Sequence, residues 1–152
     1  MMRQFEIVIA GSATNISSVL KTMSQTRSWL TLIGAYDGNM RETIHGEDFQ
    51  WTFRFLPGAA APEHLLIALA ESKTDFTNIL ATELQKDAAQ VQIALNLVAG
   101  VDYHDYFGSF ATALNLDVAI VRRAFGRIWL QDPESLSLAE GFVHGVREVI
   151  RD

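Results

Sequence analysis

Alternating apolar and polar residues predict strands along much of the chain. The clearest segment is 49–56, FQWTFRFL, in which Phe49, Trp51, Phe53 and Phe55 fall on one side and polar residues lie between them. A period of two places one face of a strand in the core and the other in water, as in an antiparallel sheet. The same pattern predicts strands at 4–10, 28–36 and 90–98, and a short one near 40–45.

Apolar residues three and four positions apart predict helices between these strands. Pro62 suits the first turn of a helix, and the motif Ser137 to Glu140 has the composition of a capping box. The segment 117–122 fits a strand and also a helical face, and its β-branched residues favour the strand. The predicted helices lie after a cap at Ser12 or Asn15, at 62–72, 75–87 and 105–115, and from Ser137 onward.

These elements follow one another in the order β-α-β-β-β-α-α-β-α-β-α. Pairs of strands followed by helices indicate an α+β fold, with an antiparallel or mixed sheet of about five strands and helices packed mainly on one face. The 152 residues suit one domain, 1–152, with one core. We expect no internal repeat at a fixed period.

Charge is distributed unevenly along the chain. The net charge is −6, and residues 59–116 carry seven acidic residues against two basic ones. This acidic excess argues against nucleic acid as a partner, because phosphate neutralisation needs clustered lysine and arginine, and it favours a basic protein partner. Cysteine is absent. No apolar run of membrane-spanning length and no signal peptide is present, so we expect no membrane contact and a cytoplasmic protein.

The segment 102–107 concentrates polar and aromatic side chains after the predicted strand at 90–98. We interpret Asp102, Tyr103, His104 and Tyr106 as a patch that contacts another protein, with capping as the competing role of the aspartates. In the alternative hypothesis, Asp102–Phe107 forms a small-molecule or enzyme site, in which a carboxylate orients His104 or both bind a metal. The sequence predicts no catalytic residue, metal ligand or cofactor.

Two further features lie near the C-terminus. Trp129 follows an arginine-rich stretch, and we expect it to contribute to the protein contact. Arg122, Arg123 and Arg127 form the one basic cluster of the sequence. They could hold a phosphate or carboxylate, but we expect them to pair with acidic residues of the same chain or to be solvated.

Three functions compete on this basis. The first is a non-enzymatic protein-binding domain, for example a small acidic immunity or antitoxin-type or regulatory protein that binds a basic partner. The second is a small-molecule-binding domain or enzyme with its site at Asp102–Phe107. The third is a homo-oligomeric structural domain. The composition and charge favour the first.

Overall fold

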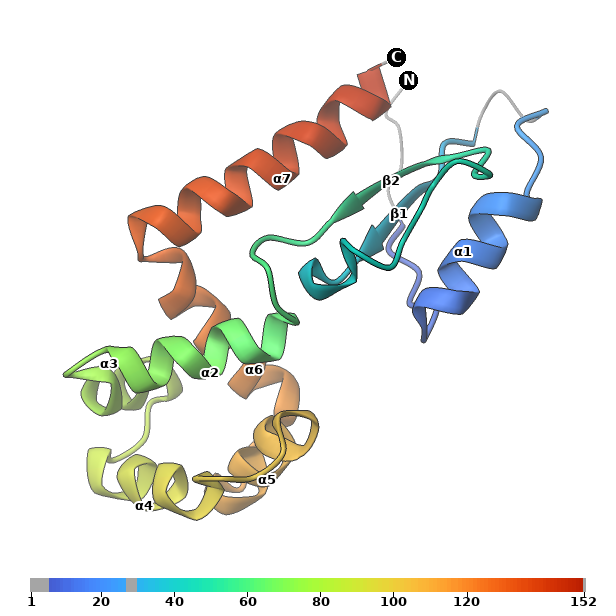
Figure 1. The fold of residues 1–152 in the computed structure, drawn as a ribbon. Coiled ribbons are helices and arrows are strands. Elements are labelled where there is room, and N and C mark those ends of the chain that lie inside the picture. Colours follow the sequence, from blue (N-terminus) through green and yellow to red (C-terminus); the bar gives the residue numbers. More distant parts are fainter. Residues whose placement is uncertain (1–5, 27–29, 152) are drawn as a thin grey trace.

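The computed structural model describes residues 6–26 and 30–151, and this part of the chain is mostly helical (Figure 1). It contains seven α-helices, one short 3-10 helix (η1) and two strands. In chain order these are α1 Ala13–Thr22, β1 Ile33–Tyr36, η1 Gly38–Met40, β2 Thr52–Phe55, α2 Pro62–Ser72, α3 Phe76–Leu84, α4 Ala88–Val98, α5 Tyr103–Leu114, α6 Val118–Leu130 and α7 Pro133–Arg151.

The expected α+β fold, with an antiparallel or mixed sheet of about five strands, is wrong. Within the described ranges the sheet has two strands, and these are parallel, with Ile33 opposite Thr52 and Tyr36 opposite Phe55. Residues 6–10 and 41–45 form no strand. The predicted segments 4–10 and 28–36 extend into residues 1–5 and 27–29, which lie outside the described residues.

The predicted strand at 90–98 is helix α4. Its alternating residues Val91, Ile93, Leu95 and Leu97 do not share a buried face, because the helix buries Val91, Ala94 and Val98 instead. Spacings of three and four residues bring those three side chains to one side of a helix. Asp87 caps the helix by accepting hydrogen bonds from the backbone amides of Ala89 and Gln90, at 2.9 and 3.4 Å. The cap and the alanine-rich and glutamine-rich first turn favour a helix over the apolar alternation.

The predicted strand at 117–122 is the start of helix α6. The side chain of Asp117 caps it, accepting a hydrogen bond from the amide of Ala119 at 2.7 Å. The helix buries Val121, Ala124 and Ile128, so the helical interpretation of this segment is the correct one.

The other predicted helices agree better with the structure. Helices α2, α3 and α5 lie where 62–72, 75–87 and 105–115 were expected, and Ser12 caps α1 by accepting a hydrogen bond from Asn15 at 3.2 Å. The capping box at Ser137 is wrong, because α7 already begins at Pro133 and Asp132 accepts a hydrogen bond from the amide of Ser135 at 3.0 Å. Pro133 has no backbone N–H and suits the first position of a helix, so α7 begins one turn before the Ser137 motif.

Helices α3 to α6 enclose the main hydrophobic core. Helix α3 packs on α4 and α6, helix α5 packs on the same two helices, and α2 lies against α5 and α6. Phe125 is completely buried at the centre, with ring centroids 5.2 Å from Phe76, 5.1 Å from Phe107 and 5.8 Å from Phe110. Burial of these aromatic rings against one another is the main stabilising contribution in this unit.

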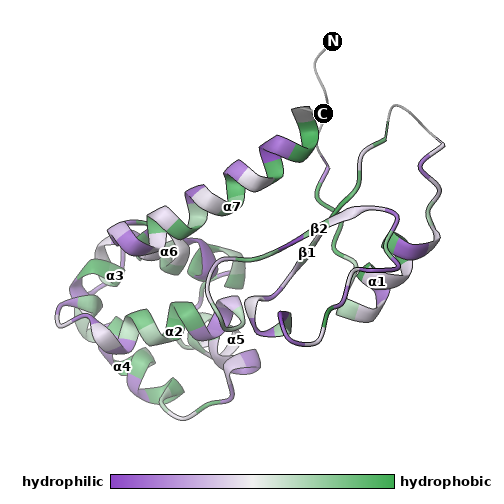
Figure 2. Ribbon diagram, turned by 45° about the horizontal axis from the view of Figure 1, so that its top comes forward, coloured by the Kyte–Doolittle hydropathy of each residue, from purple (hydrophilic) through white to green (hydrophobic). Residues whose placement is uncertain are grey.

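A smaller aromatic cluster lies in the N-terminal part, where α1 and the two strands meet. Tyr36 is buried there against Phe49, Phe53 and Phe55, and its hydroxyl is 2.9 Å from that of Ser17 on α1. Helix α7 extends from α6 to β2 and so contacts both parts (Figure 1). Hydrophobic and hydrophilic residues alternate along it (Figure 2), as expected for a helix with one face turned to water.

The units α3–α4 and α5–α6 repeat one another, so the expectation of no internal repeat is wrong. A shift of thirty positions, from Phe76 to Tyr106, aligns every buried residue of α3 and α4 with a buried residue of α5 and α6. The seven aligned pairs are Phe76 and Tyr106, Leu80 and Phe110, Ala81 and Ala111, Leu84 and Leu114, Val91 and Val121, Ala94 and Ala124, and Val98 and Ile128.

The turns of the two units also match. Gln85 and Asn115 each end a helix in the left-handed conformation, with φ of 53° and 51°. Each is followed two residues later by the aspartate that caps the next helix, Asp87 or Asp117. The repeat is not evident from the predicted elements, because 90–98 and 117–122 are predicted as strands. In the structure these segments form α4 and the start of α6.

Candidate binding surface

The residues predicted to contact a partner lie at the start of α5. Asp102 is the N-cap of this helix, and its Oδ1 accepts a hydrogen bond from the backbone amide of His104 at 2.9 Å. The same oxygen lies 2.7 Å from Nδ1 of the His104 ring. The backbone hydrogen bond is the main reason that the pKa of Asp102 is lowered, followed by the side-chain contact. Capping, the competing role, therefore accounts for Asp102.

Tyr103 lies between two histidines. Its ring centroid is 4.0 Å from that of His64 on α2 and 3.8 Å from that of His104. The stack joins α2 to the start of α5, and the sequence could not reveal it because His64 is far away along the chain. Tyr103 is half-buried while both histidines are exposed, so the outer rings of the stack face water.

Tyr106 lies in the core rather than on the surface. It is 8% exposed, and its ring packs against Phe107, Phe110 and Phe125. Burial, with a smaller contribution from Glu71, raises the pKa of its phenol to about 12. Its side chain is therefore not available to a partner in this structure. Trp129, on α6, is half-buried.

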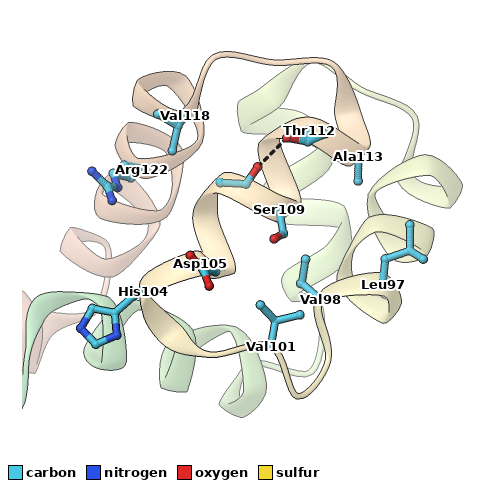
Figure 3. A pocket seen from close by; sticks show the side chains of 11 residues that line it. Leu97, Val98, Val101, His104, Asp105, Ser109, Thr112, Ala113, Val118 and Arg122 are labelled. Atoms are coloured by element: carbon cyan, nitrogen blue, oxygen red, sulfur yellow. Dashed lines mark hydrogen bonds between the residues drawn. The ribbon is translucent and has the colours of Figure 1, made fainter.

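A shallow groove runs beside α5 and brings His104 together with residues of α4 and α6 (Figure 3). Small residues of α5 form part of its lining, among them Gly108, Ser109 and Ala113. Leu97 of α4 and Val118 and Arg122 of α6 lie on either side. No cluster of three or more potential metal ligands occurs in the described ranges.

The exposed face of α4 was missed by the sequence analysis. Ile93 and Leu97 are 61% and 66% exposed, one helical turn apart, and α4 contains no charged residue. The alternating pattern of 90–98 instead predicts that both residues share one face of a strand with Val91 and Leu95. A helical interpretation of 88–98 would have placed them opposite Val91 and Val98.

The three arginines of α6 occupy the positions equivalent to the exposed residues of α4. The shift of thirty aligns Arg122 with Gln92, Arg123 with Ile93, and Arg127 with Leu97. Arg127 pairs with Glu83 of α3 at 3.6 Å, which agrees with the expected pairing, and Arg122 lies over the Phe107 ring at 6.0 Å. Arg123 makes no ion pair or hydrogen bond with any residue that the structure describes.

Comparisons with known proteins give no information about this surface. The chain matches no protein-family profile, no curated protein and no solved structure. None of the helices in residues 6–26 and 30–151 is both long and apolar enough to cross a membrane.

Proposed function

We propose that this chain is a non-enzymatic protein-binding domain, and that its contact surface is the uncharged face of α4, which binds a second copy of the chain. The observation that supports the proposal is the exposure of Ile93 and Leu97 on one side of a helix without charges. Two large aliphatic side chains one turn apart form the kind of apolar face that a helix usually buries.

The absence of charge on α4 favours a second copy over a basic partner. The chain carries a net charge of −6, so two copies repel one another over most of their surfaces. Along α4 there is no like charge to bring together. A two-fold contact would bury Ile93 and Leu97 of both copies, and full burial of such a side chain contributes about 1.5–3 kcal/mol. A basic partner remains the prediction for the exposed acidic residues at the start of α5, Asp102 and Asp105.

The groove extends this surface toward α5. Leu97 belongs both to the exposed face of α4 and to the lining of the groove, together with Val101 and His104. Most specific interfaces bury more than about 1,000 Å² in total, which one helix face does not supply by itself. A second copy seated on α4 therefore also covers part of the groove, and His104 lies at the edge of the contact.

The repeat supplies a test in which folding is preserved. Replacing Ile93→Arg and Leu97→Arg places on α4 the residues that α6 carries at the equivalent positions, where the same fold accommodates them. Sedimentation velocity across a wide range of concentration should show the parent chain moving from its monomer mass of 16.9 kDa toward twice that mass. The double variant should remain monomeric, with an unchanged far-UV circular dichroism spectrum.

Ile120→Arg is the matched control, because Ile120 is an exposed aliphatic residue of α6. It introduces the same side chain on the equivalent helix and should leave self-association unchanged. A parent chain that stays monomeric at every concentration rules out the second copy as the partner. Equal association of the parent and the double variant rules out α4 as the contact.

A further inference from the structure

The exposed arginines of α6 form a cationic surface within an acidic protein. Residues 118–131 contain Arg122, Arg123 and Arg127 and no acidic residue. All three arginines are exposed, and they occupy the second and third turns of a single helix. We call these three residues the α6 arginine face.

We propose that the α6 arginine face binds the phosphate backbone of duplex DNA. This inference concerns a different helix and a different ligand from the protein contact on α4, so the two stand or fall separately. The net negative charge of the whole chain predicts that it does not bind nucleic acid. Net charge is a sum over the whole chain, however, and does not describe the charge of one helix face. Guanidinium groups bind phosphate oxygens through paired hydrogen bonds as well as by charge.

The connection between α5 and α6 favours a duplex over other anions. Three residues, 115–117, join the two helices, as in the helix-turn-helix units that place their second helix in the major groove. An α-helix with its side chains has a diameter of about 10–12 Å, and the major groove is about 12 Å wide. The side chains of Val118 and Ala119 in the first turn of α6 are short and exposed, so this end of the helix can approach closely.

Nearby carboxylates set the expected strength of binding. Glu83 already pairs with Arg127, Asp117 is engaged as the cap of α6, and Asp105 lies across the groove from Arg122 (Figure 3). Arg123, without an intramolecular partner among the described residues, is the arginine most available to a phosphate. We therefore expect weak binding that depends steeply on salt.

Fluorescence anisotropy with a labelled duplex of random sequence tests the proposal. The full chain should bind at low ionic strength, and the logarithm of the binding constant should fall with the logarithm of salt concentration with a slope of about −2 to −3, as for two or three neutralised phosphates. The variant Arg122→Gln, Arg123→Ile, Arg127→Leu carries the residues of α4 at the same positions. It should bind at least about tenfold more weakly.

A single substitution and a matched control separate this surface from net charge. Arg123→Gln should make the salt slope shallower by about one, whereas Arg147→Gln, which removes the same charge from an exposed position of α7, should leave the slope unchanged. No binding of the parent chain at low salt overturns the proposal, and so does an equal effect of the two substitutions. A labelled polyglutamate peptide is the second probe. Binding of this peptide without binding of the duplex would identify an acidic protein as the ligand and reject DNA.

Discussion

The units α3–α4 and α5–α6 share a pattern of buried residues, but the exposed residues of their second helices differ in chemistry. The seven buried positions of α3–α4 are all buried in α5–α6 as well, and the left-handed residue of the turn and the aspartate cap also coincide. The exposed residues of the second helix differ, since α4 presents Ile93 and Leu97 where α6 presents Arg123 and Arg127. Buried positions are constrained by packing, whereas exposed ones are free to take on different partners. The same arrangement of helices therefore presents two different candidate binding surfaces, one on α4 and one on α6.

The cores of the two units differ at two positions, because Phe107 and Phe125 are buried while their equivalents Thr77 and Leu95 are half-buried. Phe125 gives the largest expected effect. Phe125 is fully buried among four aromatic rings, whereas its equivalent, Leu95, is half-buried at the edge of the core. Phe125→Ala should lower the free energy of unfolding by about 3–5 kcal/mol through lost burial and a cavity. Leu95→Ala should cost less than about 2 kcal/mol. Urea unfolding followed by circular dichroism measures both, and equal losses would remove this asymmetry between the units.

Tyr106 and Phe76 are equivalent, but Tyr106 alone can ionise. The pKa of its phenol is raised to about 12 from 10.0 because burial disfavours the phenolate. The folded state therefore resists ionisation: the associated stability is fully present below pH 10 and is lost as the pH rises from 10 toward 12. A shift of this size corresponds to about 2–3 kcal/mol.

The variant Tyr106→Phe copies Phe76 and removes the ionisable group. Urea unfolding of both proteins between pH 9 and pH 12 isolates the contribution of Tyr106, because the other titrating groups are common to the two chains. The parent chain should lose stability relative to the variant as the pH rises. A difference that stays constant over this interval would contradict a buried, shifted phenol.

The turns give the smallest expected effect. Gln85 and Asn115 both adopt the left-handed conformation, which costs about 1–2 kcal/mol for most residues but less for asparagine. Gln85→Gly should raise the free energy of unfolding by about 0.5–1 kcal/mol after the entropy of the unfolded glycine is included. Asn115→Gly should change it by less than about 0.5 kcal/mol. Thermal unfolding of the two variants distinguishes them, and a larger gain at Asn115 would show that the turns are not equivalent.

Much of the helical framework could be predicted from local residues. Pro62 and Ser12 mark the starts of α2 and α1 in the sequence and in the structure. The strands at 90–98 and 117–122 were wrong because a short apolar run fits both periods. The cap at Asp87, the alanine-rich turn after it, and the resemblance of residues 81–94 to 111–124 were the signals that could have corrected them.

The candidate site was less predictable than the framework. The capping role of Asp102 follows from its position before a helix, and the structure bears it out. The burial of Tyr106 could have been read from its helical spacing to Phe110. The stack of Tyr103 on His64 depends on how α2 packs against α5, which no local pattern encodes.

Local chemistry by itself determined where most helices begin and where the chain turns between them. A side-chain oxygen that caps an amide, or a proline without one, acts within a few residues and is visible in the sequence. Only the tertiary structure decided which apolar residues are buried. Val91 and Ile93 look alike in the sequence, yet α4 turns Val91 toward the core and Ile93 toward water. Burial depends on the neighbours that α3 and α5 supply, and those neighbours exist only in the folded chain.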